Sequence, residues 1–308
     1  SQTAIQFGFF NSNKHYMKTL KNQKPIENRN VKSILNIFDL KTGKYETVAV
    51  IDALAEAPNW EKDGKHLVYN SLGRLFRFDI DAKTSTQIDS QYCNHCNNDH
   101  VLSPDGKRVA VSHHTREDGE SRIYTFPIEG GAPTLVTPMT PSYLHGWSPD
   151  GSTLAYCAER NGQYDIYTIP VNGGLETQLT DTCGLDDGPE YSPCGKYIWF
   201  NSVRSGLMHI WRMKADGSEQ TQITDDGMND WFAHLSPDGK KVIFISYHEG
   251  DVAPGDHPAN KNVEIRMMDN DGKNIQTLVK LFGGQGSLNV NSWSPCGTKF
   301  AFMSYELK

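Results

Sequence analysis

A four-residue turn motif recurs along the chain at a nearly constant spacing, and it constrains the fold more than any other feature. Ser-Pro, then Asp or Cys, then Gly occupies residues 103–106, 148–151, 192–195, 236–239 and 294–297, with a degenerate Glu-Lys-Asp-Gly copy at 61–64. Successive copies start 42, 45, 44, 44 and 58 residues apart. Because Pro presets φ and Gly tolerates positive φ, each copy predicts a tight turn. Repetition at this period indicates an array of similar units.

The residues around each turn predict a blade of four short strands. An aromatic or apolar residue precedes every copy, and these are Trp60, Leu102, Trp147, Tyr191, Leu235 and Trp293. A β-rich run follows the turn, as in 241–245, and two further strands follow it, as in 165–169 and 176–180. Four strands per repeat are typical of a β-propeller. The sequence therefore predicts an all-β, six-bladed propeller with four antiparallel strands per blade.

The two ends of the chain should share one blade. From Ser294 onward only 15 residues remain, enough for about one and a half strands. The missing strands are expected at 34–38 and 44–48. Pairing of N- and C-terminal strands would close the ring without an open sheet edge. We expect one propeller over residues 31–308 and an N-terminal arm over residues 1–30.

Composition narrows the possible partners. The formal net charge is −7, from 30 Lys and Arg against 37 Asp and Glu, which argues against a nucleic-acid partner. No apolar run approaches the roughly 18 residues of a membrane helix, so we expect a soluble monomer without membrane insertion. A periplasmic or secreted location is preferred to a cytoplasmic one.

The repeat resembles a known family. The Trp/Leu-Ser-Pro-Asp-Gly pattern, followed by Ile-Tyr/Trp and then Gln-Leu/Ile-Thr, is similar to the C-terminal propeller of TolB over about residues 31–308. The chain looks most like stand-alone TolB-related proteins of bacteria, since the N-terminal α/β domain of TolB is not seen in this sequence. Oligogalacturonate lyases and prolyl oligopeptidases have similar repeats. The absence of a Gly-x-Ser-x-Gly elbow argues against the peptidase function.

Candidate site residues follow from the propeller geometry. The innermost strand of each blade lines the channel, and its start should lie at the mouth opposite the repeat turns. The residues expected there are Glu56, Asn97, Asn98, Asp99, His100, Tyr143, His145, Asp186, Asp187, Asp230, Trp231, His234, Gln285, Asn289 and Asn291. Loops between second and third strands add His113, His114, Arg116, Glu159, Arg160 and Arg204. A long loop, 247–262, adds His248, Asp251, Asp256 and His257.

These residue types favour a pocket for a sugar or uronic acid. Amides such as Asn98, Gln285 and Asn289 can bond hydroxyls, Tyr143 or Trp231 can stack on a ring, and Arg160 or Arg204 can pair with a carboxylate. His100 is a further candidate ligand-binding residue. The alternative is a wet channel in which polar side chains bond water and loop backbone. For Arg160 and Arg204 the simpler interpretation is a hairpin turn with a solvated guanidinium.

Two classes of function remain open at this point. A lyase would need a base, His145 or His234, and a cation, Arg160, Arg204 or a metal. A hydrolase would need a carboxylate pair, drawn from Asp99, Asp187 and Asp230. The second class is a non-catalytic propeller that binds a peptide, protein or glycan.

A divalent metal is a possible cofactor. His100, His145 and His234 could bind it if they converge, with Gln285 or Asp99 as a fourth ligand. Oligogalacturonate lyases are similar in holding a metal through His and Gln on this kind of propeller, although their local ligand motif is not reproduced here.

The cysteines and a glycine-rich segment suggest structural roles. Cys93 and Cys96 have a spacing that suits zinc, a local disulfide or two plain thiols, and no second pair of this spacing exists. Cys194 and Cys296 replace the turn Asp and are interpreted as structural. The segment 283–286, Gly-Gly-Gln-Gly, precedes no predicted helix, so we interpret it as a bend that brings Gln285 to the channel.

Overall fold

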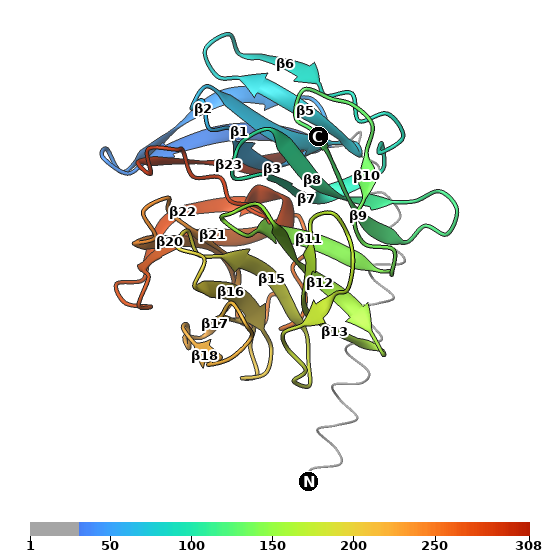
Figure 1. Ribbon diagram of the computed structural model, residues 1–308. Coiled ribbons are helices and arrows are strands. Elements are labelled where there is room, and N and C mark those ends of the chain that lie inside the picture. The colour runs from blue at the N-terminus through green and yellow to red at the C-terminus, as the bar shows by residue number, and fades with distance from the viewer. Residues whose placement is uncertain (1–30) are drawn as a thin grey trace.

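Residues 31–308 are described by the computed structural model, and they form six β-sheets arranged around an axis (Figure 1). Five sheets have four strands in sequential order, and the sixth joins the two ends of the described chain. The predicted six-bladed propeller is thereby confirmed. The arm expected over residues 1–30 lies outside the described residues.

Blades 1 to 5 each contain four antiparallel strands, numbered from the channel outward. Blade 1 contains β3 (Ala55–Trp60), β4 (His66–Ser71), β5 (Arg74–Asp79) and β6 (Thr84–Gln87). Blade 2 contains β7 (Cys96–Leu102), β8 (Arg108–His114), β9 (Ser121–Pro127) and β10 (Thr134–Leu135). Blade 3 contains β11 (Ser142–Trp147), β12 (Thr153–Arg160), β13 (Gln163–Pro170) and β14 (Thr177–Gln178). Blade 4 contains β15 (Asp186–Tyr191), β16 (Tyr197–Ser202), β17 (His209–Lys214) and β18 (Thr221–Gln222). Blade 5 contains β19 (Met228–Leu235), β20 (Lys241–His248), β21 (Lys261–Asp269) and β22 (Gln276–Gly283).

Blade 6 closes the ring, as predicted. It contains β1 (Val31–Asp39), β2 (Lys44–Ile51) and β23 (Lys299–Leu307) in the order β2-β1-β23. The register of β1 and β23 runs from Val31 opposite Leu307 to Asp39 opposite Lys299. Its innermost segment is represented by a single bridge between Trp293 and Phe300. Figure 1 shows the blue strand β1 beside the red strand β23.

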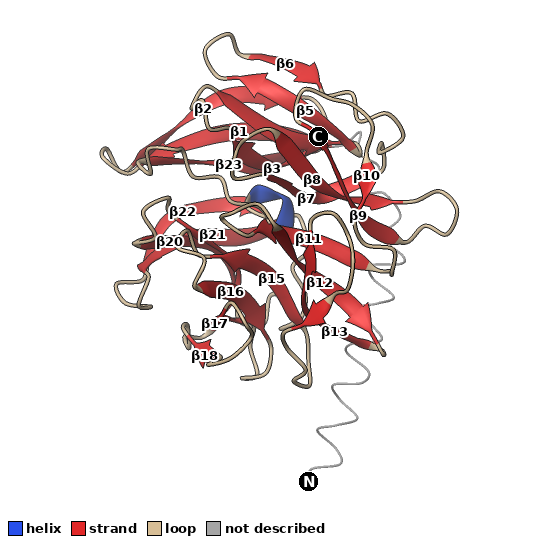
Figure 2. Ribbon diagram, viewed as in Figure 1, coloured by secondary structure: helices blue, strands red, loops and turns tan. Residues whose placement is uncertain are grey.

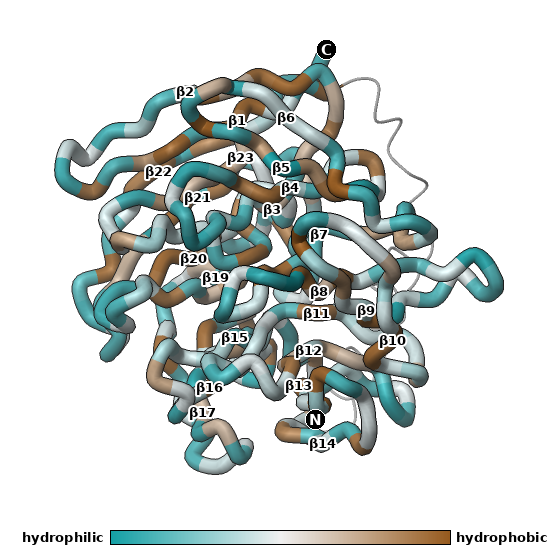
Figure 3. The backbone as a smooth tube through the Cα atoms, turned by 45° about the horizontal axis from the view of Figure 1, so that its top comes forward, coloured by the Kyte–Doolittle hydropathy of each residue, from teal (hydrophilic) through white to brown (hydrophobic). Residues whose placement is uncertain are grey.

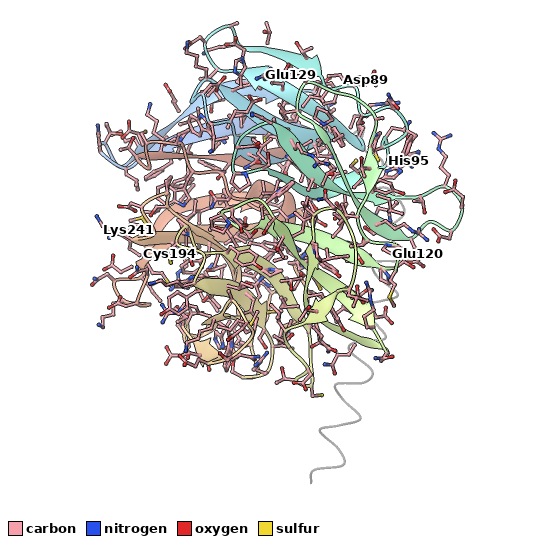
Figure 4. All side chains as sticks on the ribbon, viewed as in Figure 1. Asp89, His95, Glu120, Glu129, Cys194 and Lys241 are labelled. Atoms are coloured by element: carbon pink, nitrogen blue, oxygen red, sulfur yellow. The ribbon has the colours of Figure 1, made fainter. Side chains whose placement is uncertain are left out.

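The repeat turns form a ring on one face of the propeller. In blade 2 the Gly106 amide donates to the Ser103 carbonyl at 2.8 Å, and the Arg108 amide donates to the Ser103 hydroxyl at 2.9 Å. Neighbouring turns also touch, because a Cβ built on Gly195 would lie 3.7 Å from the ring of Pro149 in the preceding turn. Figure 4 shows Cys194 and Lys241, at two such turns, on the side opposite His95 and Glu120.

The core lies between the blades. The second strand of a blade packs against neighbouring blades on both faces, so it is apolar along its length instead of alternating. In β20 every residue from Val242 to Tyr247 is buried. At the junction of blades 5 and 6, Ile243 packs with Phe300 and Phe302. Figure 3 shows hydrophobic stretches along the strands and hydrophilic loops at the periphery.

Helical structure is almost absent from the described residues. Figure 2 shows one short helix near the middle of the ring, the 3₁₀ turn η1 (Gln285–Ser287). Within residues 31–308, no helix has the length and apolar character needed to cross a membrane.

Candidate functional site

Each of the innermost strands β3, β7, β11, β15 and β19 contains a bulge near the channel mouth. The register against the second strand shifts between Glu56 and Asn59, Cys96 and His100, Leu144 and Gly146, Asp187 and Glu190, and Trp231 and His234. A bulge adds an unpaired residue and redirects the side chains on either side of it. The bulges therefore decide which of the predicted mouth residues face the channel.

A small cavity at the mouth gathers several of the predicted residues. Its volume is about 50 Å³, and its lining residues are Asn97, Asp99, Tyr143, His145, Cys157, Tyr164, Leu185, Asp187, His257 and Gln285. A space of this size holds one or two waters or a single functional group, not a whole sugar ring. The predicted residues Asp99, Tyr143, His145, Asp187 and Gln285 thus lie around one space.

Asp187 lies between two imidazoles at this cavity. Its Oδ1 is 3.1 Å from Nε2 of His145, and its Oδ2 is 3.7 Å from Nε2 of His257. Burial alone would raise the pKa of Asp187, but the hydrogen bonds and positive charge of the two histidines hold it well below its usual range. Burial lowers the pKa of His145, yet its hydrogen bond to Asp187 and the charge of that carboxylate raise it overall. This cluster favours an ionised carboxylate beside a protonated imidazole.

Aromatic rings hold both imidazoles in place. The ring of His145 stacks on Phe232 with centroids 5.8 Å apart. The rings of His257 and Trp231 form a T-shaped pair with centroids 4.2 Å apart. Phe232 adopts φ 57° in the bulge of β19, which turns its ring toward the neighbouring blade. Trp231 is fully buried, so it supports His257 and offers no face to a ligand in the channel.

The long loop of blade 5 supplies His257. The loop spans the chain between β20 and β21, and the Tyr247 hydroxyl donates to the Pro258 carbonyl at 2.9 Å, which fixes its end. Sequence reasoning placed His257 on this loop without assigning it to the site. The sequence feature that could have indicated a role for His257 is the loop itself, since it accounts for the 58-residue spacing of the last repeat.

Amides surround Asp99 on the other side of the cavity. Asp99 accepts hydrogen bonds from Asn97 Nδ2 at 2.5 Å and from Asn289 Nδ2 at 2.7 Å. Gln285 Nε2 donates to Asn98 Oδ1 at 3.3 Å. Asn289 and Asn98 therefore orient the groups that line the cavity.

Glu56 lies close to the glycine-rich bend. Burial, with a smaller contribution from the charge of Asp99, raises the pKa of Glu56 to about 7. A Cβ on Gly286 would lie 2.5 Å from Glu56 Oε1, so only glycine permits η1 to approach this carboxyl group so closely. The bend expected at 283–286 does bring Gln285 to the channel mouth.

The three histidines predicted to converge on a metal do not come together. His234 uses both ring nitrogens within the protein, at 2.6 Å from Glu190 Oε2 and 3.1 Å from the Leu288 carbonyl oxygen. His100 is fully buried with Nε2 3.2 Å from the Val68 carbonyl oxygen, and burial lowers its pKa to about 4. His145 lies within its bulge and His100 after its own, so equal spacing from the turn does not give equal directions.

The side chains that could share a metal ion lie elsewhere. Among residues 31–308, the one group of three potential ligand atoms within 4.8 Å of one another belongs to Glu61, Asp63 and His66, at the degenerate repeat turn. Glu61 is already paired with Arg77 at 2.6 Å.

Two predicted arginines and two predicted carboxylates, Asp186 and Asp230, form hydrogen bonds within their own blades. Arg160 donates to both oxygens of Glu176, at 2.7 and 2.8 Å. Arg204 donates to Asp186 Oδ2 at 2.6 Å. Asp230 is fully buried and accepts from the Ser246 hydroxyl at 2.6 Å. The expectation that these side chains face a ligand, and that the two arginines are solvated, is corrected by these pairings.

A larger hollow adjoins the cavity. It has a volume of about 650 Å³ and is lined by His114, Asp118, Gly119, Glu120, Thr140, Pro141, Tyr143, Glu159, Asn161 and Tyr164. Tyr143 and Tyr164 line both the hollow and the small cavity. We call the 650 Å³ space the outer hollow.

The cysteines are all free thiols, and Cys93, Cys96 and Cys157 are buried. Burial raises the pKa of Cys93 to about 12. The disulfide alternative for Cys93 and Cys96 is therefore not realised, and both side chains pack in the core between blades 1 and 2. Cys194 and Cys296 replace Asp in the turns and bond the preceding Ser hydroxyls, each at 3.4 Å.

Known proteins with similar sequences share the propeller repeat. The family described as the TolB beta propeller domain matches residues 140–257. The uncharacterized protein Atu1656 of Agrobacterium fabrum (strain C58) is 47% identical over 276 residues, which cover 89% of this chain and 93% of the relative. This chain belongs to the TolB-type β-propeller family. Within that family, a solved TolB-like structure from Agrobacterium tumefaciens is 46% identical with a TM-score of 0.86, over 90% of this chain and 99% of that one.

More distant structures share the propeller fold alone. TolB from Acinetobacter baumannii is 20% identical with a TM-score of 0.60, over 95% of this chain and 62% of that one. An oligogalacturonate lyase in complex with manganese is 13% identical with a TM-score of 0.52, over 81% of this chain and 67% of that one. Fold likeness at this level does not transfer an activity.

Proposed function

We propose that this TolB-type propeller binds a carbohydrate at its channel mouth, where His145, Asp187 and His257 form an acid–base centre. The observation that carries the proposal is the position of Asp187 between two imidazoles at the edge of a small polar cavity. Titratable groups with opposing pKa shifts in one pocket are typical of functional sites.

The sizes of the two spaces suggest how a ligand would lie. The outer hollow, about 650 Å³, is within the usual range for a small-molecule site. The cavity, about 50 Å³, can take only one substituent of that ligand. Because Tyr143 and Tyr164 border both spaces, a sugar in the outer hollow would place one hydroxyl near His145.

The chemistry of the cluster suits proton transfer. With Asp187 ionised, His145 can hold a proton and donate it to a ligand oxygen, or accept one after losing it. Asp99 lines the same cavity and is the second carboxylate available for hydrolysis, while elimination would use His145 as the base. Asp230 and His234 lie outside the cavity and take no part in either scheme.

The second candidate is carbohydrate binding without catalysis. Two observations favour it: Asp99 already accepts hydrogen bonds from Asn97 and Asn289, and Asp187 is engaged by both histidines. A centre whose polar groups are satisfied in this way orients a ligand without needing to react with it.

A ligand screen with matched variants tests the proposal. Oligosaccharides are screened for thermal stabilisation and for turnover, each with divalent metal ions and with a chelator. His145→Gln and Asp187→Asn should abolish binding or turnover, while His66→Gln, which removes an imidazole near a repeat turn, should leave both unchanged. Binding that survives in both mouth variants would exclude this site. Binding without turnover would favour the second candidate.

A further inference from the structure

A second hollow lies between blades 1 and 2, on the side of the channel mouth. Its volume is about 530 Å³, and its lining residues are Leu54, Glu56, Asn70, Leu72, Gly73, Arg74, Asn94, His95, Cys96, His114 and Arg116. We call it the basic hollow, because two guanidinium groups and two imidazoles line it. Figure 4 labels His95 on this side of the molecule.

The two arginines of the basic hollow differ from most others in their pairing. Side chains that pair with carboxylates include Arg77, Arg122, Arg160, Arg204 and Arg266. Within residues 31–308, Arg74 has no side-chain hydrogen bond or ion pair, and Arg116 has only a 3.5 Å contact with Asn94 Oδ1. In a chain with a net charge of −7, two arginines without a carboxylate partner in one hollow form a local cationic site.

The backbone that carries Arg74 is held in position by blade 2. Leu72 and Gly73 form a two-residue hairpin with φ 52° and 81°, the signs of a type I′ turn. The Cys96 amide donates to the Gly73 carbonyl at 3.0 Å, and a Cβ on Gly73 would lie 2.8 Å from the Asn94 carbonyl oxygen. The hairpin therefore has a fixed place against the loop that carries His95.

Leu72 is unusual at the tip of this hairpin. It is 53% exposed, and a left-handed conformation costs a non-glycine residue about 1 kcal/mol. Asn or Gly would fit the turn better, so a leucine in this position suggests an apolar contact at the rim of the hollow.

The electrostatics of the hollow agree with its residue types. His113 lies behind it, and burial, followed by the positive charges of His95 and His114, lowers the pKa of His113 to about 4. Glu56, the carboxyl group in the lining, has a pKa raised to about 7, so its negative charge is partly suppressed near neutral pH. An anion entering the hollow would therefore meet two guanidinium groups beside a carboxyl group that is partly protonated near neutral pH.

The basic hollow adjoins the proposed ligand site. His114 lines both the basic hollow and the outer hollow, and its ring lies 6.3 Å from that of Tyr143. A ligand in the outer hollow can thus extend past His114 toward Arg74 and Arg116.

We propose that the basic hollow binds an anionic substituent, a carboxylate or a phosphate, of the ligand that occupies the channel mouth. Arg74 and Arg116 supply charge-assisted hydrogen bonds to its oxygens, and Leu72 contacts its apolar part. The nature of the rest of the ligand rests on the proposed function; the anion site itself does not.

The experiment compares four probes: glucose, glucuronate, glucose 6-phosphate and inorganic phosphate. Binding is followed by calorimetry and by NMR of the arginine side chains at low and high salt. The double variant Arg74→Gln with Arg116→Gln should weaken binding of the anionic probes about tenfold or more and leave glucose unchanged. The control, Lys107→Gln with Lys240→Gln, removes the same charge beside the repeat turns and should change nothing.

The outcomes separate the two proposals. Unchanged binding of every anionic probe by the arginine variant, an equal loss in the lysine control, or no binding of any anion by the wild-type chain would each overturn the anion site. Phosphate that binds through the two arginines while no sugar binds would support the anion site and refute the carbohydrate proposal. The stronger of glucuronate and glucose 6-phosphate identifies the anionic group.

Discussion

The two faces of the propeller are built from the same strands but use their residues differently. On the turn face the same four-residue pattern recurs, and its polar groups are satisfied within each turn, as Ser103 Oγ donates to Asp105 Oδ1 at 2.6 Å. On the mouth face the residues four positions before each aromatic or apolar turn neighbour belong to five different types, and they are Glu56, Asn98, Tyr143, Asp187, Trp231 and Asn289. Residues that repeat from blade to blade form self-contained turns. Equivalent positions whose residue types differ between blades line cavities and include titratable groups with shifted pKa values.

The mouth face is not uniform either. His145 and His234 are both buried imidazoles beside a carboxylate, yet only His145 borders the cavity. His234 joins Glu190 of blade 4 to the Leu288 carbonyl oxygen near blade 6, so it connects three blades. Differences in residue type between blades therefore indicate the face that carries the site. The hydrogen-bond partners of each side chain then decide which residues can act on a ligand.

The largest effect on stability should come from His234→Gln. Removing the imidazole leaves Glu190 buried with fewer partners, which should lower the free energy of unfolding by about 2–3 kcal/mol. Ligand binding should persist. Urea denaturation and the ligand screen measure the two effects.

The matched variant sharpens this contrast. His145→Gln should lose binding or turnover and cost less stability than His234→Gln, because His257 remains beside Asp187. If the two variants have equal stability and equal ligand binding, the proposed difference between His234, which connects blades, and His145, which contacts the ligand, is wrong.

A smaller, pH-dependent effect is expected at Glu56. Its pKa is raised from 4.5 to about 7 by burial and by the charge of Asp99, so its protonated form is favoured by folding. This contribution is fully present below pH 4.5 and is lost as the pH rises through about 7. Glu56→Gln should therefore stabilise the protein at pH 8 by up to about 3 kcal/mol relative to wild type and have little effect at pH 4. Denaturation curves at both pH values provide the check, and an equal effect at both would contradict it.

The smallest effect should come from the turn face. Asp238→Ala removes the acceptor for the Ser236 hydroxyl and the Lys240 amide, at 2.7 and 3.1 Å. Because the turn is exposed, the loss should be about 0.5–1 kcal/mol with ligand binding unchanged. A change in binding would show that the two faces are coupled.

The sequence alone was sufficient for the fold because the repeat gives the turns, the strands and the closing blade. It also placed Asp99, Tyr143, His145, Asp187 and Gln285 at the mouth, since all lie at the start of an innermost strand or in a bend near one. It could not place His100, Asp230 and His234, because the bulges reset the alternation of side chains along each strand.

Pairings between distant residues were also beyond the sequence. Arg160 and Glu176 are 16 residues apart, and Arg204 and Asp186 are 18 apart, on separate strands or loops. The contribution of His257 depends on where a long loop folds back, which neither periodicity nor turn residues specify. These are tertiary contacts, and local propensity carries no information about them.

The pairing of β1 with β23 has a consequence for biosynthesis. Asn36 donates a hydrogen bond to Ser304, 268 residues later in the chain. At ordinary rates of translation β1 must wait roughly tens of seconds for its partner, with one edge exposed in the meantime. Blades 1 to 5 can form in order as they leave the ribosome, whereas blade 6 completes last. During that interval the hairpin of β1 and β2 presents an unpaired strand edge.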